Sequence, residues 1–378
     1  MMDSFNNLGL NNNIIEGLDK QGIKIPTEIQ ALTIPKALEN QDIVGRSYTG
    51  SGKTLAYLTP IFQKIDTSKR EMQAIILAPT HELVMQINAQ IKLLATNSTI
   101  PVTSLPIIGD VNIDKQIKKL KETKPHIIVG STGRILDLIK KKKITAHTIK
   151  TIVLDEADNL LDNTSSAMVK DLIKKAMRDT QIMLFSATIN DTTLDNAKEF
   201  LKNPYIVNCA ENITLNPNIN HIYLEVDNRD KFDTLRKLIA ATNPTKALVF
   251  VNRSFDINKI KDKLNFHNKA SFALHKGISK EQRQNALESF RNGKINILVS
   301  SDISARGLDI DGITHVINLD CPTSAKEYLH RAGRTARGNN TGYSISIVNN
   351  KEVYKLKSYE KKFKISIKKG KLSHGVLS

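Results

Sequence analysis

The sequence predicts an α/β protein with two domains, each built on a mostly parallel sheet flanked by helices. Short β-branched runs alternate with amphipathic stretches in the first half of the chain, which is the pattern of a parallel sheet wrapped by helices. The pattern stops at an Asn-rich segment and then starts again. A chain of 378 residues also exceeds what one hydrophobic core usually supports.

The domain boundaries follow from where this pattern stops. The segment after Cys209 has no hydrophobic period, which is typical of a linker. After Val348 the sequence shows no helix-period segment. We therefore expect a first domain at residues 1–209, a linker at 210–218, a second domain at 219–355 and a basic tail at 356–378.

Short apolar runs bounded by polar residues predict the strands. In the first half they are residues 43–44, 74–78, 104–108, 126–129, 151–154, 181–185 and 205–207. In the second half they are residues 222–226, 247–251, 271–274, 295–299, 316–319 and 343–347. Polar and small residues follow nearly every strand of the first half, and doubly wound folds bind ligands at the carboxyl ends of strands.

Charge, cysteine content and hydropathy indicate which kind of partner and which cellular compartment to expect. The net charge of +17 and the pI near 9.6 favour a polyanionic partner, although an A/T-rich coding background would also raise the lysine content. The two cysteines, Cys209 and Cys321, are too far apart for a disulfide framework or a cysteine metal site, and we expect both to be inert. Since no leader peptide or membrane span is evident, we expect a soluble cytoplasmic protein.

The segment Ser47–Thr54 is typical of a phosphate-binding loop. It lies between a strand and a helix, where backbone N–H groups and the helix dipole attract phosphate. Lys53 would contact the terminal phosphates and Thr54 would bind Mg²⁺. The alternative is a glycine-rich turn with a purely structural role, because the consensus has Gly where this chain has Ser47. The residues expected to bind nucleotide here are Thr49, Gly50, Ser51, Gly52, Lys53 and Thr54.

An acidic motif, Asp155-Glu156-Ala157-Asp158, directly follows a predicted strand. In a chain with a phosphate loop, one carboxylate can hold Mg²⁺ while the next deprotonates the attacking water. We assign Asp155 to the metal and Glu156 to the water. Taken alone, such residues are also common as helix N-caps.

An arginine motif, His330–Gly338, lies in the second predicted domain. Arg334 and Arg337 are candidate arginine fingers, which neutralise the charge that develops on a transferred phosphoryl group. The alternative is a solvated basic turn.

Together and in this order, the three motifs resemble those of DEAD-box RNA helicases, superfamily 2 ATPases with two RecA-like domains. The resemblance extends from Phe5 to about Val348. It implies an RNA-stimulated ATPase with ATP and Mg²⁺ as cofactors and RNA as partner. It also implies that two residues recognise adenine. Gln30, at the end of the segment Gly22–Gln30, would form amide hydrogen bonds with the adenine edge, and Phe5, upstream of that segment, would stack on the ring.

The resemblance also supplies coupling and RNA-contacting residues. Coupling residues would be Ser186, Thr188, Arg306 and His330, and Asp309 would reach the ribose of ATP. RNA would be bound by Pro79, Thr80, Glu82, Gly109, Arg134, Asn252, Ser301 and the region around Arg331. Because aromatic residues make up only 5% of the chain and Trp is missing, we expect contacts to the RNA backbone rather than base stacking.

Four residues depart from the family pattern: Ser47 replaces Ala, His81 replaces Arg, Thr132 replaces Pro and Ser301 replaces Thr. A neutral imidazole at position 81 cannot replace a guanidinium with five donors, so these changes bear on RNA affinity more than on ATP chemistry. Lys-rich segments at 116–121, 140–143 and 361–371 would add to the basic surface or remain solvated.

The sequence thus favours a monomeric ATP-dependent RNA helicase of minimal two-domain form, which unwinds short RNA duplexes locally as its domains close over ATP. Two alternatives stay open. One is an RNA clamp that binds ATP and RNA but barely turns over, and the other is a DNA translocase of the same superfamily. The sequence does not name the RNA, the pathway or a protein partner.

Overall fold

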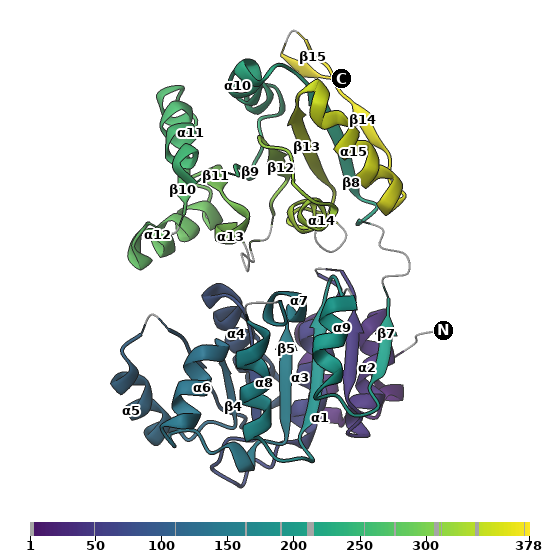
Figure 1. Ribbon diagram of the computed structural model, residues 1–378, viewed down its shortest axis with the longest axis vertical. Helices are drawn as coiled ribbons and strands as arrows, with labels where there is room; N and C mark the ends of the chain where they lie inside the picture. Colours follow the sequence, from purple (N-terminus) through teal and green to yellow (C-terminus); the bar gives the residue numbers. More distant parts are fainter. Residues whose placement is uncertain are drawn as a thin grey trace. The chain divides into compact units, whose positions relative to one another are not determined.

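The computed structural model divides into two compact units, Met1–Glu211 and Asn212–Ser378. It describes residues 4–48, 50–109, 111–162, 165–189, 191–209, 215–252, 254–275, 277–305, 310, 312–336, 340–373 and 375–378. Residues 210–214 of the expected linker lie outside this part of the chain. Each unit consists of a parallel sheet flanked by helices, so the predicted fold class is confirmed (Figure 1).

Within the described residues, the sheet of the first unit has seven strands in the order β3-β4-β2-β5-β6-β1-β7. Neighbouring strands are parallel, with Val44 paired to both Leu184 and Ile206. The strands are β1 (Ile43–Arg46), β2 (Ala74–Leu77), β3 (Ser104–Ile107), β4 (Ile127–Gly130), β5 (Thr151–Asp155), β6 (Gln181–Ser186) and β7 (Tyr205–Asn208).

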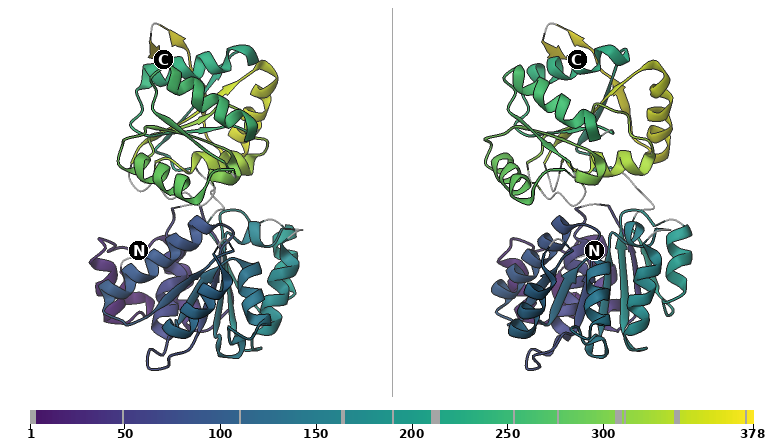
Figure 2. Two further views of the ribbon diagram at one scale, coloured as in Figure 1. Left: turned by 90° about the vertical axis from the view of Figure 1, so that its left-hand side faces the viewer. Right: turned by 60° about the vertical axis from the view of Figure 1, so that its left-hand side comes forward.

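Helices cover both faces of this sheet, because the central strands are apolar on both sides (Figures 1 and 2). In β2, Ala74 and Ile76 belong to one core, and Ile75 and Leu77 belong to the other. The helices are η1 (Phe5–Leu8), α1 (Asn12–Asp19), α2 (Glu28–Leu38), α3 (Lys53–Lys64), α4 (His81–Ser98), α5 (Ile113–Thr123), α6 (Thr132–Lys140), η2 (Ala146–Thr148), α7 (Ala157–Leu160), α8 (Ser166–Lys175) and α9 (Asp191–Lys198).

The second unit repeats the architecture. Its main sheet, counted over the described residues, also has seven strands, all parallel, in the order β10-β11-β9-β12-β13-β8-β14. The strands are β8 (Ile219–Glu225), β9 (Ala247–Phe250), β10 (Ser271–Leu274), β11 (Ile297–Ser300), β12 (His315–Asn318), β13 (Gly342–Val348) and β14 (Ile367–Lys369). The helices are η3 (Asn228–Asp230), α10 (Lys231–Thr242), α11 (Ser254–Phe266), α12 (Lys280–Arg291), α13 (Asp302–Ala305), α14 (Ala325–Ala332) and α15 (Asn350–Phe363).

Helix α15 corrects the expectation that no helix follows Val348 (Figure 1). Asn349 and Glu352 form a capping box, and the apolar side chains Leu356, Tyr359 and Phe363 are buried at helical spacing. The many lysines on its exposed positions hide this period in the sequence.

Further structure follows α15. Strand β14 pairs with β8, and β15 (Leu372–Ser373) forms a hairpin with β16 (Val376–Leu377). The expected boundary at 355–356 therefore falls inside a helix. Residues 356–369 are part of the packed unit and do not form a tail.

Both cysteine thiols are free, and burial raises the pKa of Cys209 and of Cys321 to about 11. They are protonated at neutral pH, which fits the expected inertness. Among the helices that the structure describes, none is both long enough and apolar enough to span a membrane.

Candidate nucleotide and RNA sites

The phosphate loop connects β1 to α3, as predicted. Gly50 and Gly52 have φ values of 85° and 89°, a left-handed conformation that favours glycine. A Cβ atom on Gly52 would also lie 2.5 Å from the Gln30 amide nitrogen. Both glycines are therefore required by the shape of the loop, whereas Thr49 lies outside the described residues.

The ammonium of Lys53, the first residue of α3, lies within its own loop. Its Nζ donates to the backbone oxygens of Ser47 at 2.8 Å and of Tyr48 at 2.7 Å. A phosphate chain in the loop would offer the same cation stronger acceptors than these carbonyls.

The strand order β5-β6-β1 brings three of the predicted motifs to one edge of the sheet. The acidic motif begins at the end of β5, Ser186 ends β6, and the phosphate loop follows β1. Because these neighbouring strands are parallel, their carboxyl ends are adjacent, with the Ser186–Thr188 segment in the middle.

The predicted metal carboxylate, Asp155, is 5% exposed. Tyr57 Oη donates to its Oδ2 at 2.9 Å, and the N–H of Glu156 donates to its Oδ1 at 2.9 Å. Burial raises the pKa of Asp155 above its ordinary value, although the positive charge of Lys53 opposes the shift.

Glu156, the predicted base, has the left-handed backbone conformation φ 50°, ψ 50°. This conformation is strained for a residue with a Cβ and is common at functional sites. It turns the chain from β5 into α7, and Asn159 Nδ2 donates to Glu156 Oε2 at 3.2 Å.

The Ser186–Thr188 segment contacts the two other motifs. The backbone N–H of Ser47 donates to the backbone oxygen of Ser186 at 3.0 Å. The hydroxyl of Thr188 donates to Asp158 Oδ2. One segment thus links the phosphate loop to the last carboxylate of the acidic motif. Asp158 was not among the predicted site residues. Its position in the acidic motif is the feature of the sequence that could have indicated it.

The two predicted adenine-binding residues are buried in the structure. Gln30, 1% exposed, accepts from the N–H of Thr27 at 2.9 Å and donates to the backbone oxygen of Gly52 at 3.0 Å. Its amide therefore caps α2 and also holds the phosphate loop. Phe5 is 2% exposed and packs in the hydrophobic core of the first unit.

The donors near the phosphate loop fit Mg²⁺. Thr54 and Asp155 supply oxygen ligands only, which suits a hard cation. Over the part of the chain that the structure describes, no cluster of three or more His, Cys, Asp or Glu side chains could hold a metal ion by itself.

The RNA-binding candidates of the first unit lie at the ends of β2, β3 and β4. Thr80 caps α4 by accepting the N–H of Leu83 at 3.2 Å, and Pro79 and Glu82 flank it. Gly109 is exposed, and Arg134 NH1 donates to the backbone oxygen of Val111 at 2.7 Å.

The four departures from the family pattern lie on structured elements. His81 begins α4 and is half-buried. Thr132 begins α6, is 7% exposed, and its buried hydroxyl has no hydrogen-bond partner among the described residues. Ser47 is buried at 1% exposure, and Ser301 donates through its hydroxyl to Ser304 Oγ at 3.2 Å.

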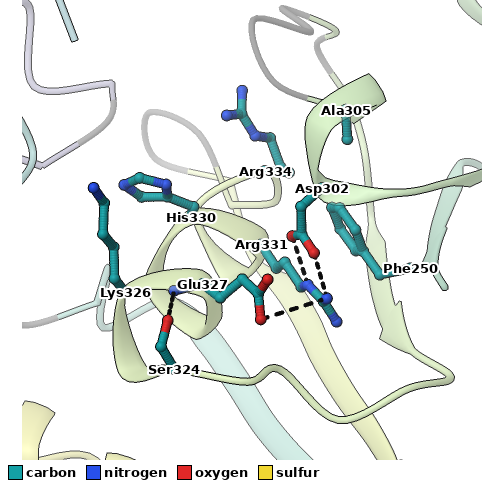
Figure 3. Close-up of a pocket in the computed structure, with 9 residues that line it drawn as sticks. All are labelled: Phe250, Asp302, Ala305, Ser324, Lys326, Glu327, His330, Arg331 and Arg334. Atoms are coloured by element: carbon teal, nitrogen blue, oxygen red, sulfur yellow. Dashed lines mark hydrogen bonds and ion pairs between the residues drawn. The ribbon is translucent and has the colours of Figure 1, made fainter. Parts of the chain in front are cut away.

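Arg331, in the region that the resemblance assigns to RNA, is itself buried. The residue is 1% exposed, and its guanidinium stacks 4.9 Å from the ring centre of Phe250 (Figure 3). It donates to Asp302 from Nε at 2.7 Å and to Asn252 Oδ1 at 2.7 Å. It also donates to the backbone oxygen of Asp320 at 2.8 Å.

These partners follow the three neighbouring strands β11, β9 and β12. Arg331 therefore ties the carboxyl ends of three strands together from inside the unit. Its donors are occupied by protein acceptors.

Two further predicted residues of the second unit, His330 and Arg334, lie in α14 and just after it. The side chains of Lys326 and His330 on α14, and of Arg334 just after it, point away from the Arg331 guanidinium (Figure 3). They line a cavity of about 130 Å³ with Phe250, Asp302, Ala305, Ser324, Glu327 and Arg331. Asn252 is exposed, and Arg306, Asp309 and Arg337 lie outside the described residues.

Comparisons with known proteins identify the family. The sequence profile of the DEAD/DEAH box helicases matches residues 27–197, and that of the helicase conserved C-terminal domain matches residues 230–339. The chain is 41% identical to the DEAD-box ATP-dependent RNA helicase CshC of Bacillus cereus, over 94% of this chain and 90% of that protein. It is 37% identical to CshA of Bacillus cereus, over 95% of this chain and 68% of that protein.

A solved structure agrees with this result. The structure of S. cerevisiae Dbp5 bound to RNA and ADP BeF3 matches 97% of this chain and 95% of its own, with a TM-score of 0.89 and 29% identity. The protein belongs to the DEAD/DEAH box helicase family.

Proposed function

We propose that this protein is an ATP-dependent RNA helicase that binds single-stranded RNA and opens short RNA duplexes locally when its two units close over ATP. The observation that carries the proposal is the grouping of the phosphate loop, the acidic motif and the Ser186–Thr188 segment at one edge of the first sheet. The relatives named above are ATP-dependent RNA helicases, and Dbp5 binds RNA and a nucleotide analogue.

On the ATP side, Lys53 would exchange its loop carbonyls for the terminal phosphates, and Gly50 to Thr54 would surround them with backbone N–H groups. Thr54 and Asp155 would hold Mg²⁺, which neutralises phosphate charge when bound. Glu156 would take the proton of the attacking water. Phe5 and Gln30 would contact adenine only after small rearrangements, since both are buried.

In the second unit, Arg334 and Arg337 would act as arginine fingers and Asp309 would bind the ribose. Arg306, His330 and the Ser186–Thr188 segment would couple closure to the ATP site. Support comes from Arg331, which fixes the helix that carries His330 against three strand ends. The ATP-binding motifs of the first unit and the arginine motif of the second unit belong to the same chain, so the proposed enzyme works as a monomer.

RNA would bind along the strand ends of both units. The candidates are Pro79, Thr80, Glu82, Gly109 and Arg134 in the first unit, and Asn252 and Ser301 in the second. Helix capping by Thr80 and the Arg134 hydrogen bond to Val111 give this surface a fixed shape, which suits contacts to sugar and phosphate. Because ATP and RNA would share the closed state, each ligand would strengthen the binding of the other.

A strand-release assay separates the helicase from the RNA clamp. We expect the chain to release one strand of a short RNA duplex in the presence of ATP and Mg²⁺, and Lys53→Ala to reduce the rate at least about tenfold because it removes a charge-assisted phosphate contact. Strand release no faster than that of Lys53→Ala, with RNA binding retained, would contradict the helicase and support the clamp.

A further inference from the structure

The candidate metal ligand Asp155 has one buried side-chain hydrogen-bond partner that the sequence did not indicate. Tyr57 lies in the first turns of α3 and is 0% exposed. Its hydroxyl donates to Asp155 Oδ2 at 2.9 Å. The phenol therefore links α3, which follows the phosphate loop, to the end of β5.

The packing around Tyr57 leaves the phenol little freedom. Its ring lies 5.5 Å from the ring of Phe185, at an interplanar angle of 51°, and Phe185 is also fully buried. Because Phe185 belongs to β6, between β5 and β1, the phenol is held by the strand that separates the two motifs. A rigid donor of this kind fixes the rotamer of the carboxylate that it contacts.

Asp155 receives one protein donor on each carboxylate oxygen, from Tyr57 and from the N–H of Glu156. Each oxygen keeps a further lone pair for a metal-bound water or a metal. Tyr57 itself has no exposed atom to offer a nucleotide. Its contribution would therefore act through Asp155.

We propose that Tyr57 is a positioning residue that aligns Asp155 for the Mg²⁺ ion that accompanies ATP. The proposal deepens the proposed function and rests on it. A tyrosine with a purely structural role would need only some acceptor for its hydroxyl. Tyr359 is an example, because its hydroxyl donates to the backbone oxygen of Pro322 at 2.9 Å. The acceptor of Tyr57 is instead the candidate metal ligand.

The test compares the affinity of the full chain for a fluorescent, non-hydrolysable ATP analogue in EDTA and at saturating Mg²⁺. The ratio of the two dissociation constants measures how much the metal strengthens nucleotide binding. Tyr57→Phe removes only the hydroxyl, and we expect it to reduce this ratio about tenfold while leaving the affinity in EDTA within about twofold. Tyr359→Phe removes a comparable buried hydroxyl in the second unit and should leave both affinities unchanged.

Two further variants make the result decisive. In the Asp155→Asn background, Tyr57→Phe should not reduce the ratio further, since both changes act through one carboxylate. Replacement of Tyr57 by 4-aminophenylalanine keeps a donor at the same position and should keep the ratio within about threefold of wild type. This variant also serves as the test if Tyr57→Phe does not fold.

An unchanged ratio in Tyr57→Phe would overturn the proposal, as would an equal loss of affinity with and without Mg²⁺. Equal losses of the ratio in the phenylalanine and aminophenylalanine variants would overturn it as well. A wild-type ratio near one would instead contradict the metal role in the proposed function, so the two failures are distinguishable.

Discussion

Replacing Glu156 by Gln is expected to lower RNA-stimulated ATP hydrolysis by about a thousandfold, the usual size of the loss when a general base is removed. Gln has the shape of Glu and can still accept the Asn159 hydrogen bond, so the turn from β5 into α7 should persist. It cannot accept a proton from water. The measurement is steady-state phosphate release at saturating ATP and RNA, together with ATP affinity, which should change less than about threefold.

The matched control is Glu122→Gln, which makes the same chemical change at an exposed position on α5. It should hydrolyse ATP at the wild-type rate. Less than a tenfold loss in Glu156→Gln, or a loss explained by weaker ATP binding, would exclude Glu156 as the base.

Replacing Arg331 by Met is expected to lower the free energy of unfolding of the second unit by about 3–5 kcal/mol, the range for removing one partner of a buried ion pair. Met fills similar space but leaves the Asp302 carboxylate and the Asp320 carbonyl without their donor. Arg331→Lys should recover only part of this loss, because one ammonium cannot reach the acceptors after three strands. Urea unfolding of the full chain, followed by circular dichroism, measures the change.

Arg229→Met is the control, since Arg229 is an exposed arginine of the same unit whose side chain is 84% exposed. Its unfolding midpoint should match that of wild type. If Arg331→Met unfolded at the wild-type midpoint, the guanidinium would not hold the strand ends together.

The fold and the ATP motifs were predictable from the sequence because their signals are local. Each predicted strand is an apolar run of a few residues, and the phosphate loop is a single continuous segment. The acidic motif likewise follows its strand directly. Parallel pairing then brings these segments to one edge without any further information.

The roles of Arg331 and Tyr57 were not predictable in the same way, because their partners are distant in the chain. Arg331 bonds Asn252 across 79 residues, and Tyr57 bonds Asp155 across 98. From the sequence alone, Arg331 would be interpreted as a surface cation in a basic motif. Tyr57 would be interpreted as an ordinary apolar residue of a helix. Only the packed structure distinguishes a solvated charge from one that ties strand ends together.

ATP hydrolysis measured without nucleic acid, with single-stranded RNA, with duplex RNA and with DNA tests the central claim most directly. Coupled binding of ATP and RNA predicts slow hydrolysis alone and at least about tenfold faster hydrolysis with either RNA, with little stimulation by DNA. Equal stimulation by DNA would favour a DNA translocase. Hydrolysis that does not change with saturating RNA would contradict the account.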